Sequence, residues 1–189
     1  MSQADSGIPS SALGTGSADE PRGLTPFQTV GPYFAILPLA GENFAAVASS
    51  IVIEGTVRDG AGAIVPDALI ETWQADAVGR CDAIDPAFRG FARAMTDESG
   101  RYEIRTVMPG PIGKSHAPHI LVGILARGVL TRLVTRIYFP GHGANATDPI
   151  LSQVPESRRA TLIAGTGGPD RYRFDIILQG PGETAFFDA

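Results

Sequence analysis

Short stretches of alternating apolar and polar residues recur along most of the chain. In residues 51–59, Ile51, Ile53 and Val57 would share one face of an extended strand, with Glu54 and Thr56 on the other. The same period of two predicts further strands at residues 68–76, 101–107, 130–139 and 172–179. Residues 119–126 are continuously apolar, which is typical of a strand covered on both faces.

The segments between these strands favour turns, with one exception. Turn-forming residues gather at 59–62, 65–67 and 97–100. Residues 155–164 predict a helix, with Pro155 at its first position, Glu156 in its first turn and Gly165 as its C-terminal cap. Short strands at regular intervals with a single helix predict an all-β protein, an antiparallel β-sandwich with one short helix.

The N-terminal part differs in character from the rest. Residues 1–23 are rich in Ser, Gly, Ala, Asp and Pro, so we expect a flexible tail. Residues 24–50 mix aromatic residues with Pro and Gly, which predicts an extended N-terminal arm packed on another surface. We therefore expect one domain over residues 24–189, including this arm.

Composition narrows the class of protein. A net charge of −5 argues against a nucleic-acid surface, which needs a basic stripe. Arg127 and Arg132 interrupt the longest apolar run, so no membrane span is expected. With Cys81 as the only cysteine, no internal disulfide can form, and no secretory signal is evident at the N-terminus. These features favour a cytoplasmic protein.

Two histidines three residues apart, His116 and His119, suggest a metal site at first sight. Side chains on one face of a strand are two residues apart, so this pair would point to opposite faces unless Pro118 lies in a bend. A stable site also needs three or four ligands. We expect His119 to be hydrogen-bonded at a strand start and His116 to lie in a loop. Cys81 beside Asp82 is expected to be neither a nucleophile nor a ligand.

Several longer stretches point to a family. The runs 53–80, 96–111 and 117–128, with TRIYFPG at 135–141 and RYRFDIILQGPGETAFFD at 171–188, resemble the intradiol ring-cleaving dioxygenases. TPFQTVGPYF at 25–34 and GETAFFDA at 182–189 are similar to the alpha chain of a two-subunit member. The resemblance implies oxygen-dependent cleavage of a catechol at a ferric iron, Fe(III), held by two tyrosinates and two histidines.

The chain departs from that ligand set. By the resemblance, Cys81 and Ile112 stand at the tyrosine positions, and His119 and Leu121 at the histidine positions. Three of four ligands are replaced, so no metal ligand and no catalytic residue is assigned to this chain. The resemblance implies that a partner beta subunit binds the Fe(III).

Function would then lie in completing the pocket of that partner. The resemblance places Thr29, Gly31, Pro32 and Tyr33 of the arm, together with Arg136, at a shared pocket for a small aromatic substrate. A guanidinium can bind a carboxylate, although a solvated or interface-pairing Arg136 is the rival interpretation. Phe186 and Phe187 are expected to lie against a partner in a hetero-oligomer.

Two alternatives remain open from the sequence. One is an autonomous intradiol enzyme that binds iron through Cys81, His116 and His119, which Ile112 and Leu121 disfavour. The other is a non-enzymatic binding module of transthyretin-like shape, which would need neither the arm nor the C-terminal stretch.

Overall fold

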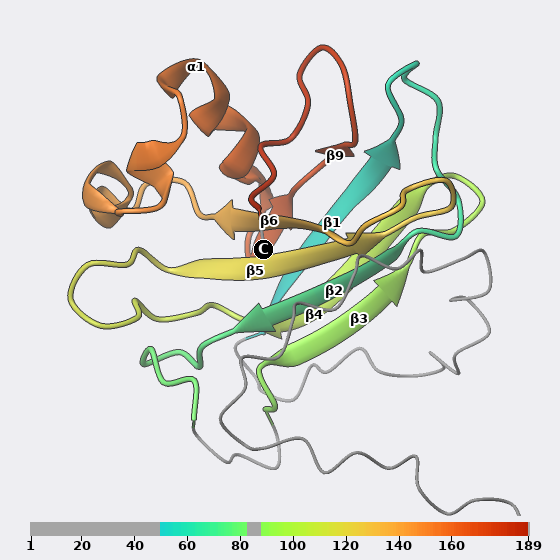
Figure 1. The fold of residues 1–189 in the computed structure, drawn as a ribbon. Coiled ribbons are helices and arrows are strands. Elements are labelled where there is room, and N and C mark those ends of the chain that lie inside the picture. Colours follow the sequence, from blue (N-terminus) through green and yellow to red (C-terminus); the bar gives the residue numbers. More distant parts are fainter. Residues whose placement is uncertain (1–49, 83–87, 189) are drawn as a thin grey trace, which may run out of the picture.

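The computed structural model describes residues 50–82 and 88–188, which form two β-sheets packed face to face (Figure 1). One sheet has the order β4-β1-β8-β7, with β9 also paired to β1, and the other has the order β3-β2-β5-β6. The strands of the first sheet are β1 (Ser50–Arg58), β4 (Arg101–Val107), β7 (Gly165–Gly168), β8 (Arg171–Arg173) and β9 (Ile176–Ile177). Those of the second are β2 (Leu69–Gln74), β3 (Phe91–Met95), β5 (His119–Leu125) and β6 (Leu133–Tyr138). The predicted β-sandwich is confirmed.

The inner faces of the two sheets form the main apolar core. Ile53 and Val57 of β1 and Ile104 of β4 meet Ile120 and Ile124 of β5, and each is at most 1% exposed. Each such side chain contributes about 1.5–3 kcal/mol by leaving water. The period of two read from residues 51–59 therefore identifies the buried face of β1 correctly.

The stretch 172–179 was predicted as one strand but forms parts of two. β8 and β9 both run parallel to β1, while the remaining strand pairs are antiparallel. Between them the backbone at Phe174 crosses directly over Gly55, where a Cβ atom would overlap the Phe174 carbonyl group. That carbonyl accepts a hydrogen bond of 2.5 Å from the Tyr102 hydroxyl. A glycine in β1 thus allows the interruption.

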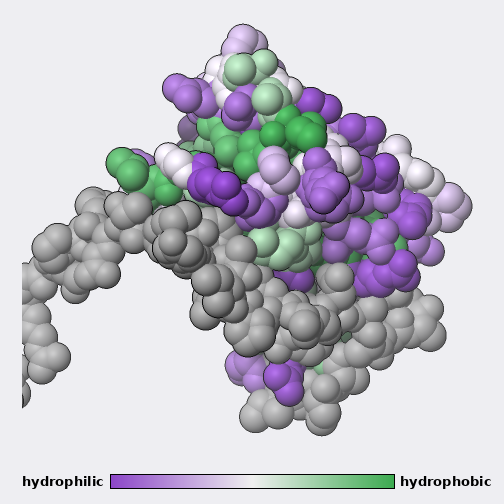
Figure 2. All heavy atoms as spheres, turned by 90° about the vertical axis from the view of Figure 1, so that its right-hand side faces the viewer, coloured by the Kyte–Doolittle hydropathy of each residue, from purple (hydrophilic) through white to green (hydrophobic). Residues whose placement is uncertain are grey.

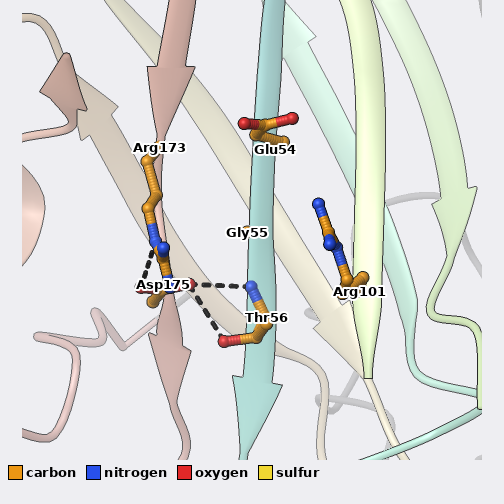
Figure 3. A pocket seen from close by; sticks show the side chains of 6 residues that line it. All are labelled: Glu54, Gly55, Thr56, Arg101, Arg173 and Asp175. Atoms are coloured by element: carbon orange, nitrogen blue, oxygen red, sulfur yellow. Dashed lines mark hydrogen bonds and ion pairs between the residues drawn. The ribbon is translucent and has the colours of Figure 1, made fainter. Parts of the chain in front are cut away.

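Asp175 fastens the interrupted segment to β1. Its carboxylate accepts hydrogen bonds from the N–H and the hydroxyl of Thr56, both 2.9 Å long, and from Nε of Arg173 at 2.8 Å (Figure 3). Burial would raise the pKa of Asp175, but these donors outweigh it and hold the pKa below its ordinary value. The small cavity around these groups, about 140 Å³ and also lined by Glu54 and Arg101, is a polar part of the outer sheet face.

Three elements differ from the sequence prediction. Strands β3 and β7 were not predicted, and the helix is shorter than expected. α1 (Glu156–Arg159) follows Pro155, which lies at the N-cap and not inside the helix, and 3₁₀ helices cover Gly143–Thr147, Leu151–Gln153 and Ala160–Leu162. Ala164 donates its N–H to the Tyr138 carbonyl, and Gly165 begins β7 instead of capping the helix. Pairing with β6 therefore ends the helical region early.

The C-terminal aromatic residues belong largely to this chain's own packing. Phe186 packs against the main core and Phe187 against a second cluster that contains Tyr138, Leu151 and Leu162. Phe187 also donates its N–H to the Val134 carbonyl of β6. Both rings are half-buried within this chain, and the expectation that a partner covers the rest stays a prediction.

The described surface is mostly polar in the side view of Figure 2, with small apolar areas. Within the described residues, large apolar side chains are exposed at Ile64, Val78 and Leu130. No helix in this part of the chain has the length and hydropathy needed to span a bilayer. The predicted tail and nearly all of the predicted arm, including Thr29, Gly31, Pro32 and Tyr33, lie outside the described residues.

Candidate functional site

A cavity of about 280 Å³ lies at the end of the second sheet where β2 and β6 end and β5 begins, at the left in Figure 1. The strands contribute Trp73, Gln74, His119, Leu121 and Arg136, and the adjoining loops contribute Ala75, Cys81, Arg89, Gly90 and Ile112. The four positions that correspond by resemblance to an iron site, 81, 112, 119 and 121, therefore all line one cavity.

The loops that carry Cys81 and Ile112 are held together by backbone contact. Gly79 has φ +87°, and a Cβ atom there would overlap the carbonyl group of Pro111. At Gly110 a Cβ atom would lie 2.5 Å from the Gly79 nitrogen, and the Gly110 N–H donates to the Asp76 carbonyl at 2.8 Å. Glycine at both places permits a closeness that no side chain allows.

The Asp76 carboxylate fixes the shape of the loop that carries Cys81. Its Oδ1 accepts the N–H groups of Val78 and Arg80, each at 2.9 Å, and its Oδ2 accepts Nε of Arg80 at 2.8 Å. The hydrogen bond from the Arg80 backbone is the main reason that the pKa of Asp76 lies below its ordinary value. The loop shape thus depends on a carboxylate turn and two glycines, and on no metal ligand.

His119 opens β5 as predicted. It is 7% exposed, and its Nδ1 lies 2.7 Å from the Ala117 carbonyl oxygen. Because a carbonyl only accepts, Nδ1 carries the proton and Nε2 keeps a lone pair. Burial lowers the pKa of His119, and the positive charge of Arg136 lowers it further, so the ring is neutral at pH 7. His119 is an acceptor here.

His116 lies closer to His119 than strand geometry alone suggests. Pro118 does lie in a bend, and the two imidazole centroids are 6.0 Å apart. Nδ1 of His116 approaches the Oδ2 atom of Asp148 at 3.5 Å. The bend at Pro118 is the exception that the sequence left open, so the two imidazoles approach each other instead of pointing to opposite faces.

The Asp148 carboxylate at the centre of this region was missed by sequence reasoning. It is fully buried, accepts the Tyr138 hydroxyl and the N–H groups of Ile150 and Leu151 on Oδ1, and accepts the Ala117 N–H on Oδ2. Burial alone would raise the pKa of Asp148, but these donors lower it overall. Burial raises the pKa of Tyr138 to about 12, so its phenol stays protonated. An Asp-Pro pair, typical of turn initiation, was the available signal.

One wall of the cavity is the aromatic side chain of Trp73, which has two close neighbours. The indole ring of Trp73 lies 5.0 Å from the Phe91 ring and 4.4 Å from the guanidinium carbon of Arg132. Gly123 makes room for Arg132, because a Cβ atom there would overlap its guanidinium group. Glu71 is 2.9 Å from Arg93 and 3.7 Å from Arg132. These contacts fix the orientation of Trp73.

The donor set of the cavity does not suit ferric iron. Hard phenolate and imidazole ligands stabilise Fe(III), whereas Ile112 and Leu121 offer only hydrocarbon. Cys81 and His119 are the two remaining donors at these positions, and Cys81 is exposed. Among the described residues, no group of three or more His, Cys, Asp or Glu side chains could hold a metal ion.

Arg136 is the one predicted substrate residue that the structure describes. It lies on β6 opposite Leu121 of β5, lines the cavity, and has Nη1 3.5 Å from the Tyr138 hydroxyl. Trp73, Gln74 and Arg89 also line the cavity and were not predicted, since no local motif marks them.

Comparisons with known proteins agree with this geometry. Residues 38–180 match a family model described as Dioxygenase. The chain is 43% identical over 190 residues to a protocatechuate 3,4-dioxygenase alpha chain from Burkholderia cepacia, covering 87% of this chain and 96% of the relative. It is 37% identical over 162 residues to a protocatechuate 3,4-dioxygenase beta chain from the same organism, covering 75% and 69% respectively.

A solved structure gives the same fold. The dioxygenase domain of a dioxygenase carbohydrate-binding protein fusion from Streptomyces sp. SirexAA-E superposes with a TM-score of 0.60 at 29% sequence identity. The match covers 83% of this chain and 99% of that one.

Proposed function

This chain belongs to the intradiol dioxygenase family, and we propose that it is the iron-free alpha subunit of a protocatechuate 3,4-dioxygenase. In this proposal a beta subunit binds Fe(III) and carries out the chemistry in the cytoplasm. Protocatechuate and O₂ combine, and the ring opens between its two hydroxyl-bearing carbons to give 3-carboxy-cis,cis-muconate. This chain completes the substrate pocket of its partner and helps to build the oligomer.

The replaced donor set carries the proposal. The cavity is lined by all four positions that correspond by resemblance to a metal site, while Ile112 and Leu121 fill two of them with hydrocarbon. A chain with this cavity needs a partner for an iron-dependent reaction. Similarity to both an alpha and a beta chain supports a hetero-oligomer of two related subunits.

The shared pocket is proposed to include Thr29, Gly31, Pro32 and Tyr33 of the arm and Arg136 of β6. Gly would allow the arm backbone to approach a ligand, Pro would stiffen it, and Thr would offer a hydroxyl. The half-buried Arg136 would place a positive charge near the carboxylate of protocatechuate without a required direct contact.

The iron content of the chain, purified alone and with its partner, tests the proposal. We expect negligible iron and no tyrosinate-to-iron colour from the chain alone, and stoichiometric iron in the assembly. The double variant Cys81→Ser, His119→Gln should leave the iron content of the assembly unchanged, because neither side chain is a ligand. Iron that survives dialysis of the isolated chain and disappears in this variant would favour the autonomous enzyme instead.

A further inference from the structure

We propose that the cavity between β2, β5 and β6 binds, without iron, the anion of a single-ring aromatic carboxylic acid that carries a para hydroxyl group. This site is lined by residues of this chain, and it shares Arg136 with the pocket proposed above. It stands whether or not the chain works beside an iron-binding partner. Its size, walls, charge and acceptor group each support it.

The size of the cavity selects a small ligand. Its volume of about 280 Å³ is just below the range of about 300–1,000 Å³ that small-molecule sites usually occupy. The walls include the indole of Trp73 and the aliphatic side chains of Ile112 and Leu121. Because contacts with Phe91 and Arg132 hold the indole in place, little side-chain ordering would oppose contact between the part of Trp73 that lines the cavity and one aromatic ring.

The charge of the lining selects an anion. Arg136 and Arg89 line the cavity, and no Asp or Glu does so among the described residues. Glu71, a carboxylate on this sheet face, is engaged by Arg93 and Arg132, and the buried Asp148 is engaged by the Tyr138 hydroxyl and by backbone N–H groups. Within the described part of the chain, no carboxylate lies at ion-pair distance from Arg136, so its guanidinium can bind a ligand carboxylate through two N–H groups.

The acceptor selects a hydroxyl at the far end of the ring. With its proton on Nδ1 directed to the Ala117 carbonyl, His119 offers Nε2 as an acceptor. Arg136 pairs with Leu121, and His119 precedes Leu121 by two residues, so Arg136 and His119 are diagonal neighbours on one sheet face. Such neighbours have Cα atoms about 7–8 Å apart, so a carboxylate bound by Arg136 and a hydroxyl bound by His119 would belong to separate positions of one ring.

Calorimetric titration of the co-purified assembly with 4-hydroxybenzoate tests the inference, because this acid lacks the adjacent hydroxyl pair that ring cleavage requires. We expect two sites for each alpha–beta pair, of which Ile112→Trp removes one by filling the cavity. Leu121→Phe, which fills it from β5, should do the same. The uncharged 4-hydroxybenzamide should not bind to the cavity site of the wild-type assembly.

A separate binding measurement tests the role of His119. His119→Phe should reduce the preference of the cavity for 4-hydroxybenzoate over benzoate about tenfold, the value of one hydrogen bond of about 1.4 kcal/mol. Arg105→Ala, a change in an exposed arginine of the other sheet, should alter neither site.

Two results would overturn the inference: a number of sites unaffected by both cavity-filling variants, or one site per pair that disappears when iron is removed. If the proposed function fails instead, the titration gives a different result. A chain without a partner would bind one equivalent of 4-hydroxybenzoate, and Ile112→Trp would abolish that binding.

Discussion

Replacing Gly55 with alanine should destabilise the fold by roughly 2–4 kcal/mol. The added Cβ atom would lie 2.7 Å from the carbonyl carbon of Phe174, closer still to its oxygen, and 3.0 Å from the Tyr102 ring. Overpacking against backbone costs about 1–3 kcal/mol. Moving this carbonyl also weakens its hydrogen bond from the Tyr102 hydroxyl, which adds about 1 kcal/mol. A domain stability of about 5–15 kcal/mol makes this loss easy to detect.

Urea unfolding followed by the fluorescence of Trp73, the single tryptophan, gives the free energy of unfolding directly. Gly143→Ala is the matched control, because no atom lies within 4 Å of a Cβ atom at Gly143 and its φ is not positive. We expect the control to stay within about 0.5 kcal/mol of the wild type. If Gly55→Ala fell in the same range, Phe174 would not cross β1 as described.

Three further results are expected. In the assembled enzyme, Arg136→Ala should raise KM for protocatechuate with iron content unchanged, and Arg105→Ala should not; wild-type kinetics for Arg136→Ala would remove it from the pocket. Tyr138→Phe deletes a donor to a buried carboxylate and should cost about 1–3 kcal/mol, so an unchanged melting temperature would contradict that role. The lowered pKa of Asp148 stabilises the fold above its unfolded value of 3.8, and this contribution is lost as pH falls through the folded value. Asp148→Asn should remove that part of the acid sensitivity in denaturation curves.

The fold was largely predictable because its central strands have a clear period of two. Where strong local patterns were absent, prediction failed. β7 has the sequence GTGG and offers no side-chain signal, and β3 reads FARAM, in which Ala92 is the buried contact. The interruption at Phe174 depends on Gly55, far away in sequence, so no reading of residues 172–179 alone could find it.

The candidate site was predictable only in part, and for a related reason. The resemblance identified positions 81, 112, 119 and 121, and the cavity brings these together. Trp73 and Arg89 reach the same cavity through sheet pairing and loop closure, which no local spacing encodes. The approach of His116 to His119 depended on whether Pro118 lies in a bend, which the sequence left open.

The close backbone contact between Gly79 and Gly110 has a consequence for protein engineering. Since these two loops dock through main-chain atoms and an aspartate turn, the frame that presents positions 81 and 112 rests on contacts that do not involve the side chains at those positions. Side chains at positions 81 and 112 can therefore be exchanged without altering the contacts that shape the two loops. Gly79 and Gly110, rather than positions 81 and 112, are the residues that a designer should leave untouched.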